Sequence, residues 1–370
     1  MAAAGGYGLT RTAAAEITGR RDELAQAVVS AQFARRPALR DRYGDAGAAK
    51  CAEDLRYHIL YLAEAVAADS PRLFSEYAAW VKVLFAGLKI PASDLRDSLE
   101  ILREVVAERV GGPVADVAAR CIAAALDGLP HVPDEPVAHL DPAAPHGWLA
   151  QRYLDALLAG DRRTATTLVL EAVEAGLPVR DAYLHVFQPT LREVGRLWQL
   201  GRISVAHEHF VTAATQATMS MLYPRIFAAE RHGLALVATC VSGEMHEIGI
   251  RMVADFFEMA GWDTYYLGAN APAAAVVRAV RERNAAVLAV SATITAHVGA
   301  VAELIRQVRE GLGDRRVHVI VGGYPFNIDP DLWRSVGADG SAAGAEDAVT
   351  LAARLGGAEF QDAGGGIAAA

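Results

Sequence analysis

The stretch LALVATCVSGEMHEIG, residues 234–249, joins an uninterrupted apolar run to a short polar loop. Similar apolar runs recur further along the chain, at residues 264–268, 286–293 and 317–323. Segments with helical spacing separate them, and apolar strands alternating with helices indicate a parallel sheet covered on both faces. With a fifth, weaker strand near residues 338–342, they predict a doubly wound, flavodoxin-like or Rossmann-like domain at residues 231–356.

Two helical regions precede this domain. From about residue 11 to 127, apolar residues recur at three- and four-residue spacing, and one predicted helix face carries Leu55, Ile59, Leu62 and Val66. We therefore expect an all-helical domain at residues 1–128. Five prolines in residues 129–147 predict an extended linker, because proline prevents both helix and sheet ladder. A four-helix bundle follows at residues 148–230, and a disordered tail is expected at residues 357–370.

Composition narrows the classes of function. A net charge of -9 and a sequence pI near 5.7 argue against direct nucleic-acid binding, which needs a basic patch. No apolar run reaches about 18 residues, so no membrane span is expected, and the N-terminus lacks a signal-peptide pattern. Cys51, Cys121 and Cys240 lie far apart without a CxxC pair, as in reduced cytoplasmic proteins. We expect a cytoplasmic protein.

Chemistry-bearing residues follow three of the predicted strands. Ligands of doubly wound sheets bind beyond the carboxyl ends of the strands. The candidates there are Glu244, His246 and Gly249 after the first strand, Ser291 and Thr293 after the third, and Gly322 and Gly323 after the fourth. A neutral imidazole is a good transition-metal ligand, and a nearby carboxylate fixes its tautomer. Small residues let a ligand approach the backbone closely.

The spacing of these residues carries a resemblance. There are 41 residues between Gly249 and Ser291 and 28 between Thr293 and Gly322. An acidic residue, His and Gly, then a Ser element, then Gly-Gly at this spacing resembles the cobalamin-binding signature. The resemblance implies that His246 binds the cobalt in place of the cofactor's own base, while the small residues line a channel for the displaced nucleotide tail. The usual acid is aspartate, and glutamate at position 244 resembles the CarH-type light regulators.

A second resemblance lies in the predicted bundle, in LWQLGRISVAHEHF, residues 197–210. Trp198, followed by nine residues and then Glu208 and His209, is similar to the motif with which CarH-type proteins cover adenosylcobalamin. It implies that Trp198 packs against the adenosyl group and that Glu208 and His209 contact it. CarH has a histidine directly after the tryptophan, where this chain has Gln199. The upper cobalt ligand after illumination is therefore open between His207, His209 and water.

The N-terminal helices carry aromatic residues around one histidine. His58 lies between Tyr57 and Tyr61 in the sequence, with cationic side chains nearby, a set that suits a planar tetrapyrrole with propionates. Helical domain, bundle and cobalamin domain together resemble the photocobilins, which pair cobalamin with biliverdin. This implies non-covalent biliverdin binding at His58, Tyr57 and Tyr61. The alternative is a helical dimerisation domain whose aromatic residues are core.

The photocobilin resemblance implies a light sensor rather than an enzyme. Light would break the cobalt–carbon bond of adenosylcobalamin and change the oligomeric state, so that the signal passes by self-association or through a separate partner protein. The first alternative is a corrinoid carrier for methyl transfer, which also combines a bundle with this sheet domain. A mutase subunit is the last alternative, because the chain has no room for a substrate barrel.

Overall fold

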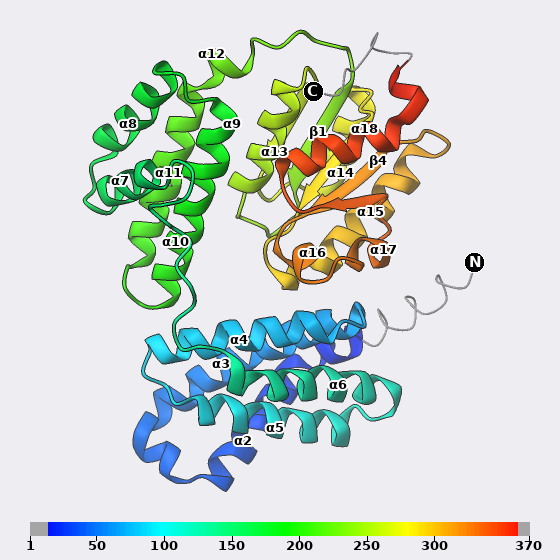
Figure 1. Ribbon diagram of the computed structural model, residues 1–370. Coiled ribbons are helices and arrows are strands. Elements are labelled where there is room, and N and C mark those ends of the chain that lie inside the picture. Colours follow the sequence, from blue (N-terminus) through cyan, green and yellow to red (C-terminus); the bar gives the residue numbers. More distant parts are fainter. Residues whose placement is uncertain (1–13, 362–370) are drawn as a thin grey trace. The chain divides into compact units, whose positions relative to one another are not determined.

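The computed structural model describes residues 14–361, which form two compact units (Figure 1). The first unit contains the N-terminal helices up to residue 134, together with residues 292–306 and 322–338. The second unit contains the bundle and most of the sheet domain, in residues 135–291, 307–321 and 339–361. No helix of the described residues is long and apolar enough to cross a membrane.

Helices α2 to α6 build the N-terminal domain. They span Arg21–Arg35 (α2), Ala38–Ala67 (α3), Pro71–Gly87 (α4), Ala92–Arg109 (α5) and Gly112–Gly128 (α6), with a 3-10 turn at Leu129–His131. The predicted apolar face of α3 is confirmed, since Leu55, Ile59, Leu62 and Val66 are all buried. Pro71 begins α4, where the missing N–H of proline costs no helical hydrogen bond.

Two segments that follow sheet strands contact these helices within the first unit. The carboxylate of Glu64 in α3 accepts a hydrogen bond from the backbone N–H of Gly299 at 2.9 Å. The hydroxyl of Ser70 donates to the carboxylate of Asp329 at 2.5 Å. Both contacts join residues far apart in the sequence, which no sequence periodicity predicts.

The bundle follows the predicted linker. Its helices are α7 (Gly147–Leu158), α8 (Arg162–Glu174), α9 (Val179–Asp181), a π-helical stretch (Ala182–Phe187), α10 (Gln188–Gln199), α11 (Val205–Met221) and α12 (Tyr223–Ile226). Asp161 caps α8 by accepting a hydrogen bond from the Thr164 N–H at 3.0 Å. The fully buried rings of Tyr153, Tyr183 and Phe187 fill the bundle core.

Five strands form one sheet, as the apolar runs predict. They are β1 (Ala235–Cys240), β2 (Asp263–Gly268), β3 (Val287–Ser291), β4 (His318–Gly322) and β5 (Gly340–Ala342), in the order β2-β1-β3-β4-β5. Strand β1 pairs in parallel with β2 and β3, and its last residue, Cys240, stands opposite Ser291. The connecting helices are α13 (Ile248–Met259), α14 (Ala273–Glu282), α15 (Val298–Leu312), α16 (Tyr324–Ile328), α17 (Leu332–Ser335) and α18 (Ala345–Gln361), with a 3-10 turn at Thr295–His297.

The predicted disordered tail begins too early. Residues 357–361 continue α18, because the helix formers Ala358 and Glu359 extend a helix that is already under way. The remaining predicted tail residues, 362–370, lie outside the described residues.

Helix α13 joins the bundle to the sheet within the second unit. Its apolar face, with Met252 and Phe256, belongs to the same core cluster as the bundle residues. Beside this face the hydroxyl of Tyr183, in the π-helical stretch, donates to the buried carboxylate of Asp255 at 2.8 Å. The guanidinium of Arg251 donates to the Ser220 hydroxyl of α11 at 2.7 Å. Polar pairs thus fix which bundle residues face α13.

The Asp255 carboxyl gives this contact a pH dependence. Burial raises the pKa of Asp255 from 3.8 to about 6. Because the folded state holds the proton more tightly than the unfolded state, the stability that protonated Asp255 contributes is full below about pH 4 and is lost as the pH rises through about 6, up to about 3 kcal/mol. Urea unfolding between pH 4 and 7 should therefore show wild type losing stability relative to Asp255→Asn. Parallel pH profiles of the two proteins would contradict this prediction.

Candidate cofactor site

The loop after β1 holds Glu244 and His246 as a bonded pair. The Glu244 carboxylate is fully buried and accepts a hydrogen bond from the His246 backbone N–H at 2.9 Å. The same oxygen, Oε1, lies 2.6 Å from His246 Nδ1, so Nδ1 carries a proton and donates. This bond leaves Nε2 as the lone-pair nitrogen of the neutral ring.

The imidazole of His246 is accessible. Its side chain is 56% exposed, and within residues 14–361 Nε2 makes no hydrogen bond. The hydrogen bond to Glu244 raises the pKa of His246, burial opposes this, and the charge of Glu208 adds to the rise. A basic, oriented nitrogen with an open approach is what a metal ion needs from a histidine ligand.

Asn270 and open space shape the rest of this loop. The Asn270 side-chain oxygen accepts the Gly243 N–H at 2.8 Å, and the Asn270 N–H donates to the Glu244 carbonyl oxygen at 3.0 Å. Gly249, in the first turn of α13, has no atom within 4 Å of the place a Cβ would take. Asn270 therefore holds the loop through two hydrogen bonds, while the space beside Gly249 stays open.

Glu247 ties the histidine loop to the bundle, which the sequence did not indicate. Its Oε1 accepts from the Gln216 side-chain amide of α11 at 2.8 Å. Its Oε2 accepts from the Tyr266 hydroxyl and the Ala269 N–H, each at 3.0 Å. One carboxylate adjacent to His246 thus connects α11 with the end of β2. No sequence motif marks these contacts, because Gln216, Tyr266 and Ala269 all lie far from Glu247 in the chain.

The ends of β3 and β4 carry the remaining strand-end candidates. Ser291 ends β3 and is buried, and Thr293 lies two residues beyond it. In the first unit, the Gly322 carbonyl oxygen at the end of β4 accepts the Ala292 N–H at 3.1 Å. Gly323 has φ +104°, and a Cβ there would collide with the Ala292 carbonyl oxygen. Only glycine fits at position 323, as expected where a loop turns tightly at a ligand channel.

The three residues that the CarH-type resemblance places against the adenosyl group lie on two bundle helices. Trp198 is near the end of α10 and 36% exposed, while Glu208 lies in the first turn of α11 and His209 directly follows it. The Glu208 carboxylate lies 2.6 Å from His209 Nδ1 and accepts from the Thr212 hydroxyl at 2.9 Å. The negative charge of Glu208 contributes to the raised pKa of His246.

Gln199, His207 and His209, which bear on the upper cobalt ligand, differ in exposure and in hydrogen bonding. Gln199 is buried. Nδ1 of His207 lies 2.8 Å from the Ser204 hydroxyl, in a capping box at the start of α11. The His209 side chain is 74% exposed.

A cavity of ≈110 Å³ lies among α2, α3 and α5 of the helical domain, and His58 lines it. His58 is buried and neutral, because burial lowers its pKa to about 4, and its Nδ1 lies 2.8 Å from the Tyr77 hydroxyl. Among the described residues, Tyr57 and Tyr61 are not part of the cavity wall. Tyr57 is 53% exposed, and Tyr61 stacks on Tyr77 with ring centroids 3.8 Å apart. Tyr57 therefore faces solvent on α3, whereas His58 faces the cavity.

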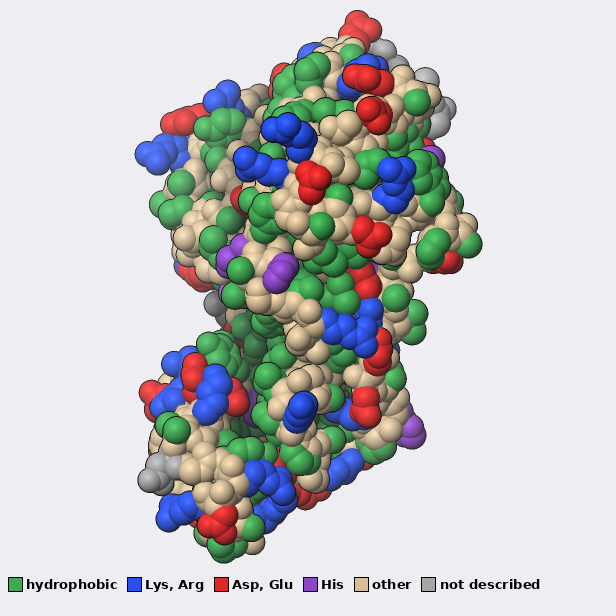
Figure 2. Space-filling view, turned by 90° about the vertical axis from the view of Figure 1, so that its left-hand side faces the viewer, with side chains coloured by type: hydrophobic (Ala, Val, Ile, Leu, Met, Phe, Trp, Pro, Cys, Tyr) green, Lys and Arg blue, Asp and Glu red, His purple; other side chains and the backbone are tan. Residues whose placement is uncertain are grey.

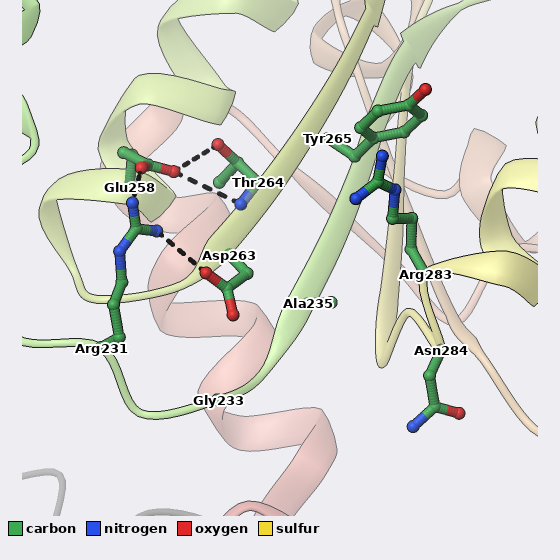
Figure 3. A pocket seen from close by; sticks show the side chains of 9 residues that line it. All are labelled: Arg231, Gly233, Ala235, Glu258, Asp263, Thr264, Tyr265, Arg283 and Asn284. Carbon is green, nitrogen blue, oxygen red and sulfur yellow. Dashed lines mark hydrogen bonds and ion pairs between the residues drawn. The ribbon is translucent and has the colours of Figure 1, made fainter.

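A larger hollow of ≈360 Å³ lies at the other edge of the sheet (Figure 3). Its wall includes Ala235 and Asp263, the first residues of β1 and β2, whereas His246 follows the last residue of β1. Arg231 and Glu258 pair within it, and Arg283 stacks on the Tyr265 ring at 4.1 Å. This hollow is separate from the histidine loop.

Comparison with known proteins indicates which ligand this part of the chain binds. Residues 234–352 match the B12 binding domain model, and residues 149–223 match a second B12 binding domain model. The chain carries a cobalamin-binding domain. The accessible Nε2 of His246 fits that corrinoid cofactor. Residues 9–129 match the phycobilisome protein model.

Related proteins cover the second half of the chain. A corrinoid protein of Desulfitobacterium hafniense strain Y51 is 28% identical over 206 residues, which are 54% of this chain and 94% of that protein. The HTH-type transcriptional repressor CarH of Myxococcus xanthus is 29% identical over 49% of this chain and 60% of its own. The solved monomethylamine corrinoid protein of Methanosarcina barkeri shares the fold, with TM-score 0.51, 21% identity and coverage of 57% of this chain and 100% of its own.

The Glu244–His246 pair gives a direct prediction for cofactor affinity. Glu244→Gln removes the charge that makes the imidazole basic, so we expect about 10- to 100-fold weaker cobalamin binding. The measurement is a titration with cobalamin followed by absorption. Glu282→Gln, on α14 and exposed, should bind as wild type does. Equal affinity of Glu244→Gln and wild type would show that the carboxylate does not support the ligand.

Proposed function

We propose that this protein is a light-sensing receptor that holds adenosylcobalamin at His246 and biliverdin in its helical domain. The observation that carries the proposal is the match of residues 9–129 to a phycobilisome protein model beside two B12 binding domain models. The similarity to a corrinoid protein covers about half of the chain, and the carrier function gives the N-terminal helices no role. Phycobilisome proteins hold bilins, which supports a light-absorbing pigment there.

The proposed site divides between two faces of the corrin. Adenosylcobalamin supplies a cobalt–carbon bond that visible light breaks. His246 would bind cobalt from below through Nε2, with Glu244 holding Nδ1. Trp198 would shield the adenosyl group, and Glu208 with His209 would contact its polar atoms. Indole rings suit the first task because they bury a large flat area, and a carboxylate accepts hydrogen bonds from hydroxyl groups.

The polar contacts of α11 supply a route for the signal. Glu208 and His209 begin this helix, and Gln216 of the same helix bonds to Glu247, next to His246. A change at the residues that would contact the adenosyl group would therefore act on a helix that is also tied to the His246 loop. A helix with two positions, biased by a local event, is what a switch requires. We expect the change to alter self-association and so reach a downstream protein partner, without turnover of a substrate and without direct nucleic-acid contact.

The helical domain would bind biliverdin non-covalently. His58 and Cys51 both line its cavity. Burial raises the pKa of the Cys51 thiol, so little thiolate is present at neutral pH to add to a vinyl group. A neutral His58 also leaves the cavity without a cationic imidazole.

A corrinoid methyl carrier is the second candidate. The similarity to the corrinoid protein of Desulfitobacterium hafniense extends over 94% of that protein, and dimethylamine corrinoid proteins of Methanosarcina match at 27–29% identity. In that function the bundle would cover the corrin between encounters with a methyltransferase. The sensor proposal ranks first because it uses the N-terminal helices as well.

Illumination separates the two functions. Full-length protein loaded with adenosylcobalamin in darkness should change its absorption under green light and elute at a different volume in size-exclusion chromatography. Protein loaded with hydroxocobalamin, which lacks the adenosyl group, is the control and should elute identically in darkness and light. Unchanged elution after complete loss of the adenosyl group would contradict the sensor and favour the carrier.

A further inference from the structure

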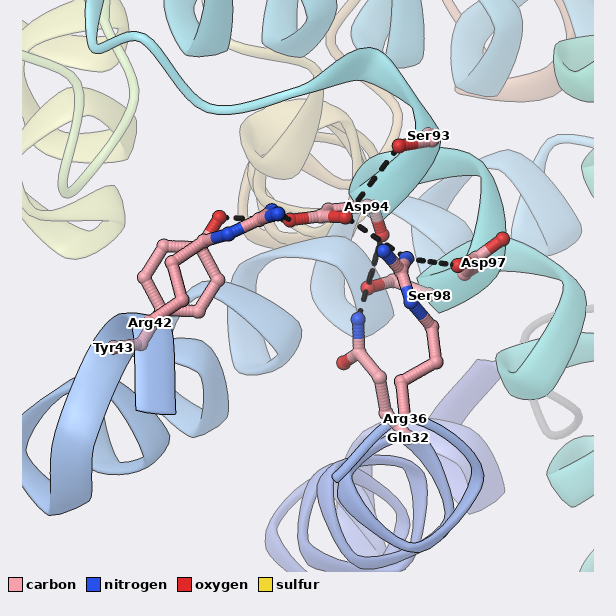
Figure 4. A network of polar contacts seen from close by, with 8 residues as sticks. All are labelled: Gln32, Arg36, Arg42, Tyr43, Ser93, Asp94, Asp97 and Ser98. Atoms are coloured by element: carbon pink, nitrogen blue, oxygen red, sulfur yellow. Dashed lines mark hydrogen bonds and ion pairs between the residues drawn. The ribbon is translucent and has the colours of Figure 1, made fainter. Parts of the chain in front are cut away.

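The cavity of the helical domain is lined by both apolar and polar side chains, and many of the polar ones gather on one wall. The polar wall centres on Asp94, in the first turn of α5 (Figure 4). Its buried carboxylate accepts from Tyr43 at 2.7 Å, Arg36 at 2.9 Å and Arg42 at 3.3 Å. Leucine, isoleucine and phenylalanine side chains make up much of the rest, namely Leu39, Leu55, Phe85 and Ile90.

One polar atom in this wall lacks a partner. Gln32, in α2, is 4% exposed, and its Oε1 makes no hydrogen bond within the described residues. Its Nε2 donates to the Asp94 carbonyl oxygen at 3.4 Å, which fixes the orientation of the amide, because a flipped amide would set two oxygens against each other. A buried acceptor without a donor destabilises the fold, because it has lost its hydrogen bonds to water and gained none in the protein. The ligand-free protein carries that cost at the cavity wall.

The remaining polar groups of the cavity leave a narrow choice of ligand. The Asp94 carboxylate already has three donors, and His58 is neutral and bonded to Tyr77. Lys50, Cys51, Asp54 and Ser98 also line the cavity, and among the described residues Gln32 Oε1 is its buried side-chain acceptor without a donor. A ligand that satisfies this acceptor needs an N–H or O–H donor. The lactam end ring of a linear tetrapyrrole supplies such a donor, since it is flat and carries one N–H beside its carbonyl oxygen.

We propose that Gln32 is the recognition residue for one end ring of the bilin, whose N–H donates to Gln32 Oε1. The inference rests on the proposed biliverdin binding and names the residue that selects the ligand. The cavity of ≈110 Å³ is smaller than the roughly 300–1,000 Å³ that enclose a whole drug-sized ligand, so it takes one ring. The rest of the tetrapyrrole lies toward solvent along the helices.

Substitution of Gln32 has two effects of opposite sign. In the full-length protein, Gln32→Leu removes the unpaired acceptor, so the ligand-free protein should melt at a higher temperature than wild type. The same change removes the ligand's partner, so the Kd for biliverdin, from absorption titration, should rise about tenfold. Gln32→Met repeats the test with an unbranched side chain. Gln26→Leu is the matched control on the exposed face of α2 and should leave the Kd unchanged.

Each outcome decides a separate question. Biliverdin binding by wild type with a raised Kd in both Gln32 variants supports the inference. Wild-type binding with an unchanged Kd in Gln32→Leu and Gln32→Met overturns the role of Gln32 and leaves the bilin function standing. If wild type does not bind biliverdin, the bilin function and the inference both fall. Binding of haemin in place of biliverdin would overturn the linear tetrapyrrole as ligand.

Discussion

The two hydrogen bonds that the Glu244 carboxylate accepts from His246 fix the candidate site. A fully buried carboxylate is costly unless it is bonded, so the loop after β1 has to fold around this pair. The backbone bond sets the loop, and the bond to Nδ1 turns Nε2 outward. Because Asn270 holds the same loop from the β2 side, the imidazole is oriented before any ligand arrives, which lowers the entropy cost of binding.

The second unit surrounds this pair with polar contacts that join bundle and sheet. Glu247 bonds to Gln216, Arg251 to Ser220, and Asp255 to Tyr183. All three come from the histidine loop or the helix that follows it. The bundle is therefore held against the elements that orient His246. In the proposed switch, a movement of the bundle would act on these existing hydrogen bonds. Charged side chains of both signs are interspersed on the face shown in Figure 2, so no single basic patch dominates it.

The sequence predicted the sheet well, because strands buried on both faces must be apolar along their whole length. It also predicted the hydrogen bond between Glu244 and the His246 ring, since the two residues are only two positions apart. Glu247 with Gln216 could not be predicted, because the pair joins two domains and neither residue belongs to a motif. Tyr57 was grouped with His58 by sequence adjacency, although in the structure Tyr57 is exposed and His58 is buried at the cavity.

The central claim is that His246 is the protein ligand to cobalt, and electron paramagnetic resonance tests it most directly. Protein labelled with ¹⁵N-histidine would be loaded with unlabelled cobalamin and reduced to the paramagnetic Co(II) form. Coordination by His246 predicts that the axial nitrogen splits each cobalt line into a doublet, which Glu282→Gln retains and His246→Ala loses. A ¹⁴N triplet in the labelled protein would show that the cofactor keeps its own benzimidazole, and would contradict the claim.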